Sequence, residues 1–197
     1  SKNWINRQRR DIYVRKSKVE GYRSRAVYKL EEINKKFNIF YNGASVLDLG
    51  AAPGSWSQYI SKNYKNIKLA SIDLNKFDQI ENTFQIIGDF TENTFKQKIL
   101  NFFKGKIDIV ISDMAVNTTG NKNLDSIQTS ELCLDAMRFS KEVLKKNGTF
   151  VSKIFIGSTF NEIIDESKKI FKKNKVFKPS ASRKESKESF IVCGMLR

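Results

Sequence analysis

The 197-residue sequence contains no histidine, two cysteines and two prolines, and it has no long apolar run. Without histidine, proton transfer must use Lys, Asp, Glu, Tyr or Cys, and neither a zinc site nor any other metal site is expected. Cys133 and Cys193 lie in apolar-periodic segments and lack metal-ligand spacing, so we expect reduced core residues, as in an intracellular protein. No stretch approaches the roughly 18 apolar residues of a membrane-spanning helix.

The first residues are basic and polar, so we expect no secretory signal segment. Cytoplasm, nucleus and an organelle all remain open as compartments. Residues 1–22 carry scattered aromatics and predict a basic N-terminal arm or a short helix. The length predicts one domain over residues 23–197, with a core that buries about 70% of the unfolded chain's surface.

Positive charge is what the sequence has in excess, with 36 Lys and Arg against 21 Asp and Glu, a net charge of +15. Residues 1–35 carry 11 basic and 4 acidic side chains, and residues 168–197 carry 10 and 2, whereas the residues between them are neutral. If the fold brings these two basic flanks together, that face suits a polyanion such as RNA. A solubilising, lysine-rich surface would explain the same composition.

From residue 45 onward, short apolar segments alternate with segments of helical period. The predicted strands are SVLDLG, IKLASIDL, TFQIIGDF, IDIVISDMA, TFVSKIFI, KVFKP and SFIVCGML. The predicted helices include one from an N-cap at Ser24 to Phe37, one after an N-cap at Thr91, one over 124–146 and one over TFNEIIDESKKIFKK. This alternation predicts an α/β fold with about seven strands, mostly parallel, and helices on both faces of the sheet. The last two strands have no helix between them and should form an antiparallel hairpin at one edge.

The segment VLDLGAAPGSWSQYI has the pattern of a strand, a turn of small residues and a helix, as in a nucleotide-binding fold. Asp73 follows Gly50 by 23 residues at a strand end, where it could accept from ribose hydroxyls. Asp89 ends the next strand and could accept from an adenine amino group. A nucleoside without a pyrophosphate fits this loop better than a dinucleotide, which points to S-adenosylmethionine (AdoMet). The alternative is an α/β domain without a ligand.

Lys153 lies inside the apolar segment TFVSKIFI, where an ammonium group is costly to bury. Asp113 ends the strand that the doubly wound order places beside it, so the two charges can pair. In the simpler interpretation, Lys153 reaches outward to water and Asp113 caps the loop that follows it.

Six segments appear in order and resemble the FtsJ (RrmJ) family of RNA ribose 2′-O-methyltransferases over roughly residues 8–197: GYRSRAVYKLEEI, VLDLGAAPGSWSQYI, GDF, SDMA, VSKIF and SRKESKESFIVCG. The resemblance implies a Rossmann-like, AdoMet-dependent methyltransferase fold. The catalytic residues that it implies are Lys29, Asp113, Lys153 and Glu188. The cofactor contacts that it implies are Gly54, Trp56, Asp73, Asp89 and Asp113. Val116 departs from the proline that the family usually has after SDMA, which puts the loop over the cofactor in doubt.

By this resemblance, a ribose 2′-oxygen attacks the methyl group of AdoMet, and no metal is needed. Lys153 either accepts the hydroxyl proton or stays charged and stabilises the developing alkoxide. The expected substrate is a uridine of large-subunit rRNA. A tRNA anticodon-loop methyltransferase and an inactive RNA-binding module are the alternatives. We expect a monomer, whose recognition of RNA could depend on a ribosomal particle or an accessory protein.

Overall fold

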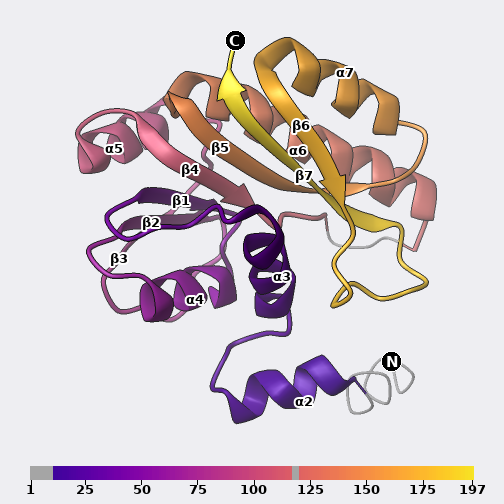
Figure 1. The fold of residues 1–197 in the computed structure, drawn as a ribbon, viewed down its shortest axis with the longest axis horizontal. Helices are drawn as coiled ribbons and strands as arrows, with labels where there is room; N and C mark the ends of the chain where they lie inside the picture. Colours follow the sequence, from indigo (N-terminus) through magenta and orange to yellow (C-terminus); the bar gives the residue numbers. More distant parts are fainter. Residues whose placement is uncertain (1–10, 117–119) are drawn as a thin grey trace.

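The computed structural model describes residues 11–116 and 120–197. Within them, seven strands form one sheet in the order β3-β2-β1-β4-β5-β7-β6 (Figure 1). The strands are β1 (Ser45–Leu49), β2 (Lys68–Asp73), β3 (Thr83–Ile87), β4 (Ile107–Ser112), β5 (Leu144–Phe155), β6 (Phe171–Phe177) and β7 (Glu188–Leu196). Strands β1 to β5 pair in parallel, and β7 lies antiparallel between β5 and β6. The predicted α/β fold and its antiparallel edge hairpin are confirmed.

The helices cover both faces of this sheet. They are α2 (Ile12–Val19), α3 (Val27–Phe37), α4 (Ser55–Asn63), α5 (Asn93–Phe103), α6 (Lys122–Val143) and α7 (Phe160–Ile170). One core lies between the sheet and α5, α6 and α7, and a second lies between the sheet and α3 and α4. In the part of the chain that the structure describes, no helix combines the length and hydropathy needed to cross a membrane.

The two cores follow from the period of two along each strand. Phe150 of β5 packs with α6 and α7, whereas its neighbour Val151 packs with the core under α3 and α4. Lys153 lies two residues after Val151 and therefore points to the face that α3 covers. The same alternation along β7 turns Glu188 toward the face of Phe190 and Val192, which belong to the α3 side.

Two of the predicted helix ends were wrong. Helix α6 ends at Val143, because Leu144 already pairs with Ile107 in the ladder between β4 and β5. Helix α7 ends at Ile170, and the next residue, Phe171, is fully buried at the start of β6. Both predicted helices ran into lysine pairs that continue a helical pattern, but the sheet pairing and the burial of the apolar residues overrode it.

Both predicted N-caps were also wrong. Helix α3 begins at Val27, and the Ser24 hydroxyl accepts from the Ala26 N–H and bonds the Ser55 hydroxyl at 2.8 Å. Helix α5 begins at Asn93, while the Thr91 hydroxyl donates to Asp89. Both side chains form local turns, for which serine and threonine also have a preference.

Both cysteines are free and buried in the core, as predicted. Burial raises the pKa of the Cys133 thiol to about 12, although a hydrogen bond with Ser152 opposes this, and burial also raises the pKa of Cys193. Because the thiolate is the reactive form, neither cysteine is suited to nucleophilic chemistry at neutral pH.

Candidate active site

The pairing of β4 with β5 brings Asp113 to Lys153. Ser112 lies opposite Ser152 in the parallel register, so the next residues, Asp113 and Lys153, meet at the carboxyl ends of the two strands. Lys153 is 7% exposed, and its Nζ donates to the main-chain oxygen of Asp113 at 2.7 Å. The same Nζ lies 3.1 Å from Asp113 Oδ1. The acidic partner therefore offsets the cost of burying this ammonium group.

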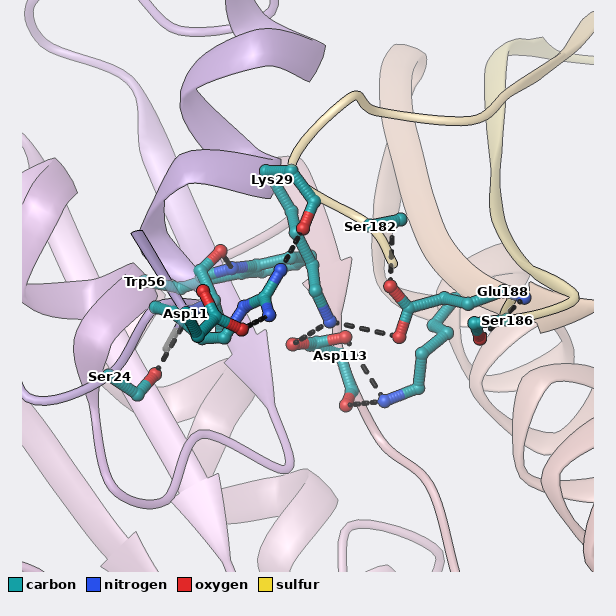
Figure 2. Close-up of polar contacts among 12 residues, drawn as sticks. Asp11, Ser24, Lys29, Trp56, Asp113, Ser182, Ser186 and Glu188 are labelled. Atoms are coloured by element: carbon teal, nitrogen blue, oxygen red, sulfur yellow. Dashed lines mark hydrogen bonds and ion pairs between the residues drawn. The ribbon is translucent and has the colours of Figure 1, made fainter. Parts of the chain in front are cut away.

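Helix α3 and strand β7 add the other two predicted residues. Lys29 extends from α3, and its Nζ lies 2.9 Å from Glu188 Oε2 and 3.7 Å from Asp113 Oδ2 (Figure 2). The structure thus joins Glu188, Lys29, Asp113 and Lys153 in one line of alternating charge, which we call the tetrad. It brings all four together from α3, β5, β7 and the end of β4. Their catalytic roles stay predictions.

The tetrad charges stabilise one another. Burial alone would lower the pKa of Lys29, but Asp113 and Glu188 outweigh it and hold that pKa above its usual value. Burial would raise the pKa of Asp113, yet Lys153 and Lys29 hold it below its usual value. Lys29 is therefore a cation and Asp113 an anion at neutral pH, which leaves Lys29 unsuited to accept a proton.

The loop between β6 and β7 holds Glu188 in place, and the sequence analysis did not predict these contacts. The Ser182 hydroxyl donates to Glu188 Oε1 at 2.7 Å (Figure 2). The Glu32 carboxylate of α3 accepts the N–H groups of Ser180 and Ala181 at 2.6 and 2.8 Å. Ser182 and Glu32 both lie inside segments that resemble the FtsJ family, and this is the sequence signal that could have found them.

The predicted cofactor loop follows β1 and lies beside three strand-end carboxylates. Asp73 accepts the Ala52 N–H at 2.9 Å and so fixes the loop against the end of β2. Asp89 follows β3 and accepts from the Thr91 N–H and hydroxyl, both through Oδ1. Gly50 has φ +67°, and a Cβ there would lie 2.0 Å from Met114 Cγ. The loop and the end of β4 are therefore in close contact, and Gly50 allows it.

Gly54 and Trp56 are tied to the chain's own packing. A Cβ on Gly54 would lie 2.6 Å from Ile80 Cδ1 and 2.9 Å from Arg23 Nη1, at φ +100°. The Trp56 indole is 3% exposed and donates to the Ala26 oxygen at 2.8 Å. A cofactor contact by Trp56 is thus left to its main-chain N–H in the first turn of α4. Arg23, which the sequence analysis missed, joins this loop to the next by donating to the oxygens of Pro53, Asp78 and Gln79.

Asp48 is a further buried acid beneath the loop. Burial raises its pKa to about 7, against a hydrogen bond from Ser57, and the charges of Asp113 and Asp73 raise it as well. The Ser57 hydroxyl donates to Asp48 Oδ2 at 2.7 Å. Its protonation therefore responds to the charge of the neighbouring site near neutral pH.

These residues fit AdoMet. Asp113 Oδ1 is buried, and its neighbour among the described residues is the Lys153 ammonium at 3.1 Å. The carboxylates of Asp73 and Asp89 lie where ribose and adenine donors of a bound nucleoside could reach them. A cationic ligand that carries hydroxyl and amino groups matches this set of acceptors better than an anionic one.

The sheet order and the strand-end carboxylates define a Rossmann-like methyltransferase fold. Human methyltransferase-like protein 13, solved in complex with SAH, has this fold, with a TM-score of 0.60 and 11% identity over 86% of this chain and 79% of that one. A ribosomal RNA methyltransferase from Plasmodium falciparum superposes with a TM-score of 0.79 and 33% identity, covering 89% of this chain and 98% of that one.

The FtsJ-like methyltransferase family model matches residues 22–196. Ribosomal RNA large subunit methyltransferase E of Pelagibacter ubique is 64% identical over 197 residues, covering 100% of this chain and 97% of that protein. The protein of the same name from Rickettsia bellii is 47% identical, covering 98% and 87%. The chain belongs to the FtsJ-like methyltransferase family and is a methyltransferase, which confirms the resemblance seen in the sequence.

Proposed function

We propose that this enzyme transfers a methyl group from AdoMet to the ribose 2′-hydroxyl of a uridine in large-subunit rRNA. The observation that carries the proposal is the tetrad, which holds two lysines and two carboxylates beside the cofactor loop. The names of the Pelagibacter and Rickettsia relatives support large-subunit rRNA as the substrate. The SAH in the human structure with the same fold is consistent with AdoMet as the donor.

AdoMet supplies a methyl group that its sulfonium already activates, so the chain's task is to prepare the nucleophile. Lys153 is fixed by two contacts with Asp113, one to the main-chain oxygen and one to Oδ1. An ammonium has three N–H donors, so one remains for the 2′-oxygen. Lys153 directs this donor at the 2′-oxygen and stabilises the negative charge that develops there as the hydroxyl proton passes to water. Glu188 and Lys29 keep Asp113 in place.

Methyl transfer tests this proposal directly. The protein is incubated with tritiated AdoMet and, separately, with unmodified large ribosomal subunits, protein-free large-subunit rRNA and tRNA. We expect label in the rRNA, in a uridine linkage that resists alkaline cleavage because its 2′-oxygen is methylated. Label in tRNA alone would overturn the substrate, and label on a base would overturn the 2′-oxygen as the acceptor. No label in any RNA would overturn the function.

The affinity for RNA is expected to fall steeply with salt. The two basic flanks meet at the tetrad, because Lys29 pairs with Glu188 and Arg25 lies against the loop before β7. For single-stranded RNA the logarithm of affinity should fall with the logarithm of salt, with a slope of about −0.7 for each phosphate neutralised. Filter binding over a salt series measures this slope, and AdoMet affinity in the same buffers is the control. A flat response for RNA would show that the flanks do not contact phosphates.

A further inference from the structure

A charged cavity lies on the side of the tetrad formed by Lys29 and Glu188. Its volume is about 310 Å³, and its lining residues are Arg25, Lys29, Arg183, Glu185, Ser186 and Glu188. Glu188 is paired with Lys29, and Glu185 is exposed, so Arg25 and Arg183 are the cations that an anionic guest would meet. The lining contains no residue of the cofactor loop, so the cavity lies beside the tetrad and apart from that loop.

A carboxylate from outside the sheet already holds these two arginines. Asp11 Oδ2 pairs with Arg25 Nη1 and lies 3.7 Å from Arg183 Nη2. Arg25 and Arg183 are far apart in sequence, yet they converge on this one oxygen. Asp11 Oδ1 meanwhile caps α2 by accepting the N–H groups of Tyr13 and Val14. Arginine binds carboxylate and phosphate with the same planar fork of donors, so a site built for one accepts the other.

Helix α2, which carries Asp11, is held by few buried contacts. It lies away from the sheet in Figure 1. Within α2, all of which the structure describes, Ser17 alone is buried, and Ile12 and Val19 are 63% and 88% exposed. The helix contacts Tyr28 of α3 through the ring of Tyr13, the ammonium of Lys16 and, at its C-cap, the carboxylate of Glu20. So little buried area makes α2 easy to displace.

The arginines do not depend on Asp11 alone for their positions. Arg25 also donates to the main-chain oxygen of Ala181, in the loop that Glu32 holds against α3. Arg25 would therefore keep its place if Asp11 left, and its guanidinium would face the cavity without a counter-ion. A buried, unpaired guanidinium is unfavourable, so another anion must replace the carboxylate.

We propose that Arg25 and Arg183 form a phosphodiester-binding subsite next to the target ribose, and that Asp11 occupies it in the free enzyme. The RNA backbone displaces the Asp11 carboxylate, and α2 moves aside as the strand enters. This inference rests on the proposed function only in taking RNA as the substrate.

The variant Asp11→Asn tests the proposal, because asparagine caps a helix as well as aspartate but carries no charge. We expect it to bind a short oligouridylate roughly three- to tenfold more tightly, since the RNA no longer competes with a carboxylate. Glu20→Gln is the matched control: it removes the same charge from the end of the same helix, where Glu20 bonds Tyr28 and Lys16 rather than the arginines. Fluorescence anisotropy without AdoMet measures both affinities.

Arg183→Gln should weaken RNA binding and should also reduce the gain from Asp11→Asn, because the two residues act at one site. The proposal is overturned if Asp11→Asn weakens binding, or if its gain equals that of Glu20→Gln. Thermal melts check folding, and Asp11→Ser serves as a second cap-preserving variant. Wild-type methyl transfer is assayed in parallel. If the wild-type protein transfers no methyl group but Asp11→Asn still binds RNA more tightly, the proposed function is wrong and the subsite stands. If methyl transfer is normal but Asp11→Asn has no such effect, the subsite alone is rejected.

Discussion

Replacing Lys153 with alanine is expected to slow methyl transfer to RNA by about a hundred- to a thousandfold while leaving AdoMet affinity largely unchanged. Lys153 is fixed by two contacts with Asp113 and has one donor left for the 2′-oxygen, and loss of one such donor commonly costs this much. The protein should still fold, because Asp113 keeps Lys29 as a partner. Single-turnover transfer of a tritiated methyl group gives the rate, and calorimetric titration gives the AdoMet affinity.

Lys145→Ala is the matched control, since Lys145 lies in the same strand and also pairs with an aspartate. Its Nζ lies 2.7 Å from Asp108 Oδ1 at the amino end of β4, at the opposite end of the strand from the tetrad. This variant should transfer methyl groups at the wild-type rate. Wild-type turnover in Lys153→Ala would refute the assignment. Loss of AdoMet binding in that variant would place Lys153 in the cofactor site instead.

The sequence predicted Asp113 and Lys153 from their own positions because both anomalies are local. A lysine inside an apolar strand and an aspartate at the end of the next one are visible in a short stretch of sequence. The parallel register then fixes their meeting, since Ser112 lies opposite Ser152. The alternation of strands and helices is visible along the sequence, and βαβ units pair their strands in parallel, which is why the order of elements could be predicted as well.

Lys29 and Glu188 could be predicted only through the family resemblance. A lysine in a helix and a glutamate in a basic loop are usually solvated, and nothing local marks them as partly buried. Their meeting depends on the insertion of β7 between β5 and β6 and on the packing of α3 over that face. Such contacts join residues 159 positions apart. No periodicity within one segment carries that information.

The contacts of Asp11 and Arg23 lay beyond prediction for the same reason. Asp11 was included in a polar arm, and its pairing with two arginines depends on where α2 packs. Arg23 falls within the basic flank of residues 1–35, yet it joins two loops through main-chain oxygens. The two helix ends were wrongly predicted for a different reason. At Leu144 and Phe171, pairing in the sheet overrode a helical pattern that continued into lysines.

Asp113→Asn should both abolish methyl transfer and destabilise the fold by about 3 kcal/mol near neutral pH, because it leaves two buried lysines with one carboxylate between them. The hydrogen bond from Lys153 to the main-chain oxygen of residue 113 survives the change, so Lys153 keeps its anchor. What the variant removes is the charge. Urea denaturation across a pH series measures the free energy of unfolding, and the tritium assay measures transfer.

The dependence of this stability difference on pH follows from the two shifted tetrad groups. The pKa of Asp113 is lowered in the folded protein, so its stabilisation is full above the unfolded value of about 3.9 and is lost as pH falls through the folded pKa. The pKa of Lys29 is raised, so its contribution is full below about 10.4 and is lost as pH rises through the folded pKa. The difference between wild type and variant should therefore be constant near neutral pH and shrink in strong acid, where Asp113 itself becomes neutral.

Asp108→Asn is the control for Asp113→Asn. It shows whether an effect comes from removing any partly buried negative charge or from removing a charge of the tetrad. Burial opposes ionisation of Asp108, but hydrogen bonds from Lys145 and Ser45 lower its pKa to about 2, so its neutralisation should also destabilise the fold. Because Asp108 lies at the amino end of β4, away from the strand ends that carry the site, its variant should keep methyl transfer. If Asp113→Asn retained wild-type transfer, the charge of Asp113 would not be catalytic. If the variant lost no more stability than a surface substitution, that charge would not be needed to neutralise the buried lysines.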